Sequence, residues 1–173
     1  MTTPSDPNNS IRRSKKILIA LDYARSAREV AEVGYSISKA MNAEVILLHV
    51  MADSAYYSTP GYMPIVGFSN FNHADFLEMI DVEGLRKAGM HFMDRMKSHL
   101  GDENITSLIE EGDVADIVIK TASQLNADMI VIGSRSRNWL EKVFTGSTAV
   151  KVLDLTTIPL LIIPVKEDSN SNK

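Results

Sequence analysis

The sequence contains no cysteine, and this absence excludes several kinds of site at once. A disulfide scaffold, a zinc site made of thiolates and a cysteine nucleophile all need that residue. A surplus of positive charge is also missing, since the formal net charge is −4, and we therefore expect no binding to nucleic acid. No apolar run approaches the length that spans a bilayer, so we expect no contact with a membrane.

The two ends of the chain have few apolar residues. Residues 1–10 lack the apolar stretch of a signal peptide, and we therefore expect a cytoplasmic protein. Residues 1–14 and 167–173 cannot bury enough apolar surface to offset the entropy lost on ordering, so we predict that both are disordered extensions. The 173 residues suit one domain, which we place at residues 15–166.

Several catalytic motifs are missing as well. The chain has no G-x-x-x-x-G-K-[S/T] P-loop, no G-x-G-x-x-G dinucleotide loop and no G-x-S-x-G nucleophile elbow. The segment Asp22–Ser26 differs from the loop that PP-loop adenylating enzymes carry after their first strand. The four histidines have no carboxylate partner at a metal-ligand spacing, and we interpret His49 as a core histidine whose hydrogen bonds are satisfied. We therefore expect no catalytic residue and no metal ligand.

Five short segments rich in apolar residues are present, and each has the length of a buried β-strand. They cover residues 16–21, 44–50, 105–110, 128–133 and 158–165. Between these runs, apolar residues recur at helical spacing. This alternation predicts an α/β fold of the Rossmann-like type, with a five-stranded parallel sheet and helices on both faces.

The segments between the predicted strands contain further signals. Asn42 and Gly101 are placed to end helices, and Asp113 is placed to cap one at its N-terminus. Residues 51–73 show no period, so we predict a long loop there, before a helix over 75–100. The aromatic part of this loop, residues 56–71, has two interpretations: a lid or partner surface, or an excursion whose rings pack on the edge of the sheet.

The residues that follow the strands are the candidates for a site, because open parallel sheets bind ligands at the carboxyl ends of their strands. Gly133 ends one predicted strand, and Gly146-Ser147 opens a helix. A helix N-terminus offers free N–H groups to a phosphate, and glycine lets the backbone approach it closely. Arg135 and Arg137, which lie between them, either pair with phosphates or form a solvated basic loop.

These residues resemble the universal stress protein family, whose ATP-binding members carry G-x2-G-x9-G-[S/T] after the fourth strand. Gly133, Gly146 and Ser147 match this motif, and Ser136 replaces its second glycine. Further similar segments at strand ends extend over nearly all of residues 15–166: Lys15–Asp22, Leu47–Val50, Glu111-Gly112, Ala127–Ser134 and Ile158–Pro164. The resemblance implies an adenine nucleotide alpha hydrolase-like fold that binds ATP, or else AMP or ADP, with or without Mg²⁺.

The same resemblance assigns contacts to the nucleotide. Asp22 would hold the ribose or adenine side, Ala20 would lie beside the base, and Val50 would meet the edge of the base through main-chain groups. The residues around the phosphates would be Ile132, Gly133, Arg135, Ser136, Gly146, Ser147 and Thr148. A carboxylate accepts several hydrogen bonds and so suits two sugar hydroxyls, but an aspartate at the position of Asp22 can also cap the following helix.

Ser136 separates the functions that remain open. If this position needs a left-handed backbone, serine costs roughly 1–2 kcal/mol, which weakens phosphate binding about tenfold. We expect a regulatory ATP-binding protein with at most slow hydrolysis. One alternative is a dimeric stress-protein scaffold in which Ser136 has disabled the pocket. The other is an ATPase or phosphotransferase, for which the loop offers only Glu141 as a carboxylate.

The family's winding would put the last strand at an edge of the sheet. The apolar run Leu160–Val165 could then pair with the same strand of a second chain, and we predict a homodimer built on it. The alternative is that the N-terminal arm or the 51–73 loop covers this edge within one chain.

Overall fold

The computed structural model describes residues 14–51, 82–134 and 148–165. Its five strands form one sheet in the order β3-β2-β1-β4-β5, and every neighbouring pair is parallel. The predicted five-stranded parallel sheet is therefore confirmed. The strands are β1 (Lys15–Leu21), β2 (Ala43–Met51), β3 (Thr106–Glu111), β4 (Met129–Ser134) and β5 (Leu160–Pro164).

The last strand differs most from its predicted bounds. β5 begins at Leu160, although the apolar run starts at Ile158. The backbone N–H of Ile158 donates to the side-chain oxygen of Thr156 at 3.0 Å, which holds this segment in a turn. Leu160 is the first residue that pairs with β4, opposite Ile130. The apolar run is thus longer than the strand because its first residues form the approach to the sheet.

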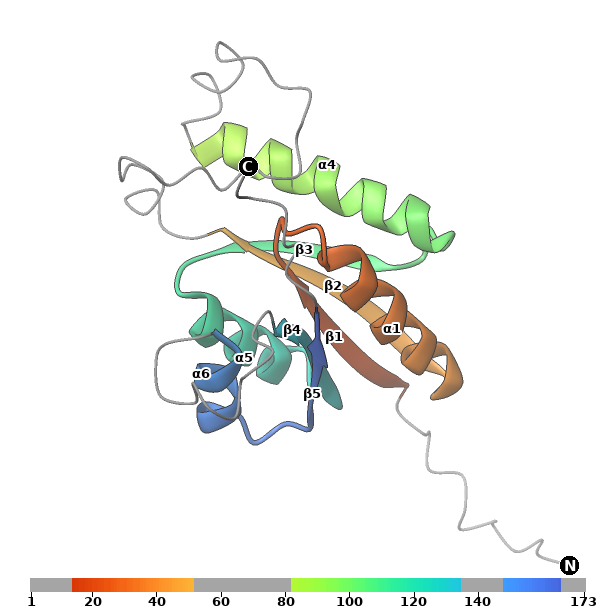
Figure 1. Cartoon of the computed structure of the whole chain (residues 1–173), viewed down its shortest axis with the longest axis vertical. Coiled ribbons are helices and arrows are strands. Elements are labelled where there is room, and N and C mark those ends of the chain that lie inside the picture. Colours follow the sequence, from red (N-terminus) through yellow and green to blue (C-terminus); the bar gives the residue numbers. More distant parts are fainter. Residues whose placement is uncertain (1–13, 52–81, 135–147, 166–173) are drawn as a thin grey trace, which may run out of the picture.

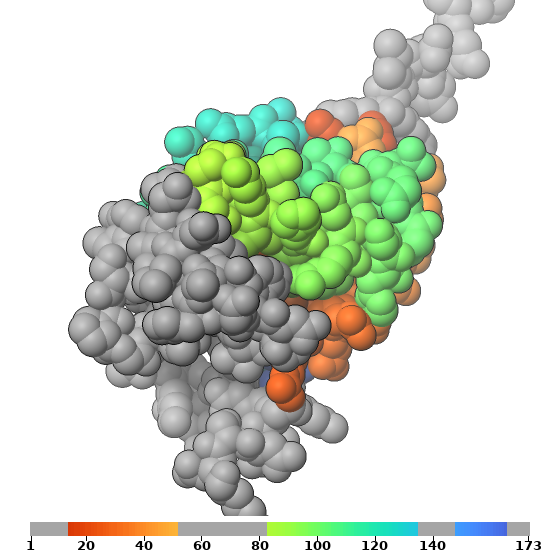
Figure 2. All heavy atoms as spheres, turned by 90° about the horizontal axis from the view of Figure 1, so that it is seen from above, coloured from red at the N-terminus to blue at the C-terminus, as the bar shows by residue number. Residues whose placement is uncertain are grey.

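Helices cover both faces of the sheet, as predicted (Figure 1). The helices α1 (Ala27–Ala40) and α4 (Val82–Leu100) pack on one face, and α5 (Val114–Gln124) and α6 (Thr148–Leu155) pack on the other. Seen from above, the yellow-green atoms of α4 lie across the outer surface of the first face (Figure 2). The sheet is therefore the middle of three layers.

The core consists of two apolar layers, one on each face of the sheet. Ile17 and Ile19 belong to the layer beneath α1 and α4, whereas Leu18 belongs to the layer beneath α5 and α6, because successive strand residues point to opposite faces. All three side chains are fully buried. A strand covered on both faces needs apolar residues at successive positions, which explains the nearly continuous apolar sequences of β1, β2 and β4.

The predicted helix ends are confirmed. Asn42 and Gly101 follow α1 and α4 with φ angles of 51° and 66°, the left-handed conformation that commonly ends a helix. Asp113 is the N-cap of α5, and its carboxylate accepts hydrogen bonds from the backbone N–H groups of Ala115 and Asp116 at 3.1 and 3.2 Å.

The winding of the sheet changes direction at β1. The chain passes from β1 to β2 and β3 on one side, and then crosses to β4 and β5 on the other. The ladder between β1 and β2 runs over Lys15–Leu21, whereas the ladder between β1 and β4 joins only Ile17–Ile19 to Met129–Val131. The carboxyl ends of β1 and β4 therefore continue past the end of their shared ladder, at the switch point where open sheets bind ligands.

Some predictions fall on residues outside the described ranges. These are the two disordered extensions, nearly all of the loop over 51–73 and the start of a helix at 75. Met51 itself ends β2 and is buried, so the predicted loop was wrong to include this residue. In the described ranges, no helix has the length and apolar character needed to cross a membrane.

Candidate functional site

Three predicted site residues lie on one face of the sheet, close to its carboxyl edge. Ala20 on β1, Val50 on β2 and Ile132 on β4 all belong to the apolar layer beneath α5 and α6. Val50 and Ile132 are buried, with 8% and 5% exposed, whereas Ala20 is only partly buried although it lies on the central strand. Leu18, two residues earlier on the same face, is completely buried, so the cover over β1 thins toward its carboxyl end.

Asp22 follows β1 directly and is exposed. Its carboxylate accepts a hydrogen bond from the backbone N–H of Ala24 at 3.0 Å, which forms a tight turn after the strand. The helix α1 has Ser26 as its N-cap, so the interpretation of Asp22 as the helix cap is wrong. The carboxylate instead lies at the switch point, one residue beyond the strand.

Gly133 on β4 has a packing role against α1. A Cβ atom on this residue would lie 2.8 Å from Cγ2 of Val30 on α1 and 4.0 Å from Cγ1 of Val165. Real Cβ atoms do not approach so closely, so only glycine lets α1 lie this near the end of β4. The Cβ position of Gly133 therefore faces α1, on the opposite side of the sheet from Ile132. A glycine at a strand end gives no sequence signal that distinguishes these two roles.

The helix α6 begins at Thr148, which is exposed at its first turn. Ala149, the next residue, is buried against the same layer as Ala20 and Ile132. The N-terminus of α6 therefore lies on the face of the sheet that carries the apolar site residues. The N-terminus of a helix carries a partial positive charge, which favours a phosphate.

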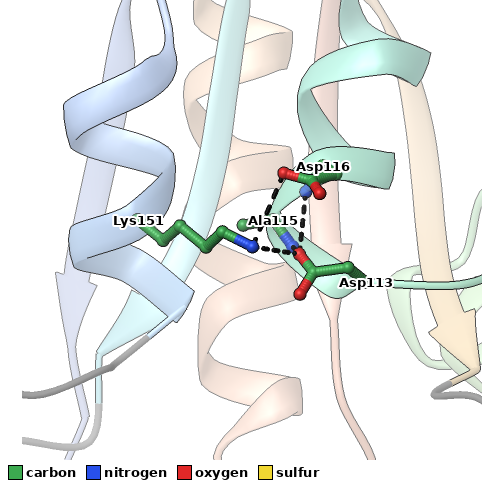
Figure 3. Close-up of polar contacts among 4 residues, drawn as sticks. All are labelled: Asp113, Ala115, Asp116 and Lys151. Carbon is green, nitrogen blue, oxygen red and sulfur yellow. Dashed lines mark hydrogen bonds and ion pairs between the residues drawn. The ribbon is translucent and has the colours of Figure 1, made fainter.

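A charged cluster joins α6 to the start of α5 (Figure 3). The ammonium group of Lys151 lies 2.9 Å from a carboxylate oxygen of Asp113 and 3.6 Å from one of Asp116. The hydrogen bond from Lys151 is the main cause that lowers the pKa of Asp113, and the same bond raises the pKa of Lys151. Sequence reasoning found Asp113 as a cap but missed Lys151, because the contact depends on α5 and α6 being neighbours.

Four predicted contacts lie outside the described residues: Arg135, Ser136, Gly146 and Ser147. The structure thus describes both ends of the predicted phosphate loop, at Gly133 and Thr148. Within the described ranges, no group of three or more histidine, aspartate or glutamate side chains could hold a metal ion.

The sequence matches the universal stress protein family over residues 13–164. The chain belongs to this family. The stress response protein NhaX of Bacillus subtilis is 29% identical to it over 160 residues, which cover 90% of this chain and 93% of the relative. The universal stress protein YxiE of the same bacterium is 25% identical over 150 residues, which cover 86% of this chain and 97% of the relative.

Solved structures of the family share the fold. The universal stress protein UspA from Lactobacillus plantarum has a TM-score of 0.59 at 25% identity, covering 87% of this chain and 98% of that chain. A universal stress protein in complex with cAMP has a TM-score of 0.56 at 19% identity, covering 86% and 95%. A family protein from Arabidopsis thaliana with AMP bound has a TM-score of 0.54 at 16% identity, covering 91% and 94%.

Proposed function

We propose that this universal stress protein binds an adenine nucleotide, preferably ATP, where β1 and β4 part, and that it acts as a cytoplasmic regulatory protein. The observation that carries the proposal is the arrangement around the interrupted ladder. Ala20 and Ile132 lie on the same face, on either side of it, and Asp22 is exposed directly beyond Ala20. An apolar floor suits a purine ring, and a carboxylate suits the hydroxyls of a ribose.

The phosphates would lie toward the segment Gly133–Thr148. The N-terminus of α6 is on the same face as the apolar floor, and the sequence between the two described ends carries Gly146-Ser147. Two structural relatives were solved with cAMP or AMP, which supports an adenine ligand. Mg²⁺ would enter the site bound to the phosphates of ATP.

We also propose that the protein alone turns over ATP slowly at most. The sequence has no P-loop lysine, and the segment 135–145 offers only Glu141 as a carboxylate. Steady-state phosphate release measures this property directly. A rate near 10 per second, about the median for enzymes, would contradict it.

Isothermal titration calorimetry with ATP, ADP, AMP and cyclic AMP tests the binding proposal. We expect micromolar affinity for ATP. Ser136→Gly should tighten binding about tenfold if serine is strained there, and Gly146→Val should abolish it by blocking the approach of a phosphate. No heat of binding with millimolar ATP would overturn the proposal and favour the scaffold that does not bind nucleotide.

Two variants with the same change in charge make the test specific to the site. Asp22→Asn keeps the size of the side chain and its bond to Ala24, but removes the charge that would strengthen hydrogen bonds from the ribose. Glu44→Gln removes one exposed negative charge near the amino end of β2, whereas Asp22 lies at the carboxyl edge of the sheet. Removing a negative charge should otherwise favour an anionic ligand, so about tenfold weaker binding in Asp22→Asn alone would identify the carboxylate as a contact.

We propose, finally, that the protein is a homodimer built on β5. This strand lies at an edge of the sheet, and Leu161 and Ile162 on it are only partly buried. A second copy could pair with this edge and cover these side chains. Light scattering at micromolar concentration should give a mass of about twice 19.1 kDa for the wild type. The variant Ile162→Lys should have the mass of a monomer, 19.1 kDa. A wild-type mass near 19.1 kDa would contradict the dimer.

A further inference from the structure

His49 is a buried polar residue that the proposed site does not explain. It lies near the carboxyl end of β2 with 2% of its surface exposed. Its Nδ1 is 2.9 Å from the carbonyl oxygen of Leu21. Because a carbonyl oxygen can only accept a hydrogen bond, Nδ1 carries the proton and donates it. Nε2 is then a bare acceptor, and it is buried with no hydrogen-bond partner in the described part of the chain.

The prediction of a core histidine is confirmed, but among the described residues only Nδ1 has a hydrogen-bond partner. A buried acceptor without a donor is unfavourable, and an apolar side chain at this position would avoid that cost. Burial also lowers the pKa of His49, which keeps the ring neutral at neutral pH. The feature of His49 that an apolar residue lacks is the Nδ1–H that reaches Leu21.

The ring of His49 also holds the residue on the other side of Asp22. The ring centroids of Tyr23 and His49 are 4.2 Å apart. Phe92 on α4 completes the group, with its centroid 5.1 Å from that of Tyr23 and 5.7 Å from that of His49. Asp22 thus lies between two residues that His49 contacts, Leu21 by a hydrogen bond and Tyr23 by ring packing.

The position of this group in the sheet gives the contacts their importance. Leu21 and His49 are the last paired residues of the ladder between β1 and β2, and the ladder between β1 and β4 has already ended at Ile19. Asp22 therefore follows a strand end that is hydrogen-bonded to β2 but not to β4. A protein side chain that is held in place before the ligand binds loses less entropy on binding than one that must first be ordered.

We propose that His49 is a positioning residue for Asp22. Its Nδ1–H donates a hydrogen bond that fixes the carbonyl of Leu21, the residue before Asp22. Its ring packs against Tyr23, the residue after Asp22. Together these contacts set the place of the carboxylate that would receive the ribose. The inference rests on the proposed nucleotide function, because the consequence of correct positioning is affinity for the nucleotide.

A matched pair of variants separates the hydrogen bond from the ring. His49→Asn and His49→Leu have side chains of nearly the same shape, and both lose the outer part of the imidazole. Only asparagine can place a donor where Nδ1 stands. We expect His49→Asn to bind ATP within about threefold of the wild-type affinity and His49→Leu to bind about tenfold more weakly.

A second pair tests the same inference at Tyr23, in case His49→Leu does not fold. Tyr23→Phe keeps the ring that packs on His49, whereas Tyr23→Leu removes it. The first should bind ATP with wild-type affinity, and the second should bind several-fold more weakly. Equal affinity for ATP in Tyr23→Leu and the wild type would show that the ring contact between Tyr23 and His49 does not position Asp22.

Amide hydrogen exchange of the protein without nucleotide supplies a readout that does not depend on binding. His49→Leu should speed exchange at the amides of Asp22, Tyr23 and Ala24 at least tenfold relative to His49→Asn. Val118 on α5, which is fully buried on the other face, is the control. A general loss of stability would speed exchange at Val118 as well, and that result would overturn the positioning role.

The two readouts distinguish the failure of this inference from that of the proposed function. If the wild type binds ATP and His49→Leu binds equally well, the positioning role is wrong and the nucleotide function stands. If the wild type shows no binding, the nucleotide function is wrong, and the exchange rates alone decide whether His49 fixes the Asp22 segment. Unchanged exchange in His49→Leu would then overturn the inference too.

Discussion

Strand β1 has two neighbours in the sheet, and the ladders that join it to them differ in extent. Toward β2, pairing runs from Lys15 to Leu21. Toward β4, it runs only from Ile17 to Ile19. The first side builds the sheet along the whole strand, and the second leaves the carboxyl ends of β1 and β4 without a shared ladder. The difference shows how one strand can serve both the fold and a site.

Side chains and packing hold the segments around the switch point. His49 ties the end of β1 to β2 through the carbonyl of Leu21. Gly133 lets α1 approach the end of β4. Asp113 and Lys151 join α5 to the first turn of α6. Each contact can be removed singly, so each provides a way to test whether the interrupted side of β1 depends on it.

The largest effect should come from Gly133→Ala. The added Cβ would lie 2.8 Å from Cγ2 of Val30, a buried and stiff side chain, so α1 or β4 must shift. We expect the free energy of unfolding to fall by about 1–3 kcal/mol, the usual cost of overpacking a core. Urea unfolding measures this change.

The double variant Gly133→Ala, Val30→Ala is the control for that prediction. Truncating Val30 removes the atom that the new methyl group meets. The cost of the double variant should then be smaller than the sum of the two single costs, by about 1 kcal/mol or more. Additive costs would show that Gly133 is not required by its contact with α1.

An intermediate effect should follow from lowering the pH, through His49. Burial holds the pKa of this side chain below its ordinary value of 6.5, so the unfolded chain takes up a proton more readily than the folded protein does. The contribution of His49 is present above pH 6.5 and is lost as the pH falls below that value. The slope for one such group is at most about 1.4 kcal/mol per pH unit.

Urea unfolding of the wild type and of His49→Leu at pH 7.5, 6.5 and 5.5 checks this prediction. The wild type should lose more stability than the variant on acidification, because the variant has no imidazole to protonate at this position. The difference between the two curves removes the contribution of the carboxylates, which both proteins share. Parallel curves would contradict a buried, neutral His49.

The smallest effect should come from Asp113, whose cap and ion pair can be separated. Asp113→Ala removes both and should cost about 1 kcal/mol in stability. Asp113→Asn keeps a good N-cap and removes only the ion pair with Lys151, so it should cost about 0.5 kcal/mol or less for these partly exposed groups. Thermal unfolding of the three proteins makes the comparison, and equal losses in both variants would assign the stabilisation to the ion pair.

The sequence allowed much of the fold to be predicted, because the signals involved are local. Apolar runs indicated strands covered on both faces. Asn42 and Gly101 marked helix ends by their left-handed backbone, and Asp113 marked one by its capping carboxylate. The family's winding predicted that the last strand lies at an edge of the sheet, and the strand order confirms this position. The bounds differed at β5, where the side chain of Thr156 delays the start of the strand.

The contacts around the switch point could not be predicted in the same way. The bond from His49 to Leu21 needs the register of β1 against β2, which periodicity does not provide. The contact of Gly133 with Val30 likewise depends on where α1 crosses the sheet. Local signals indicate which face a residue occupies, but they do not identify the residue that it meets.

The most direct test of the central claim is an NMR titration of the labelled protein with ATP, which locates the ligand rather than only detecting it. Binding where β1 and β4 part should shift the amide signals of Ala20, Asp22, Gly133 and Thr148. The signals of Glu44 and Asn104, near the amino ends of β2 and β3, should stay in place. Shifts confined to other parts of the chain, or no shifts with millimolar ATP, would contradict the account.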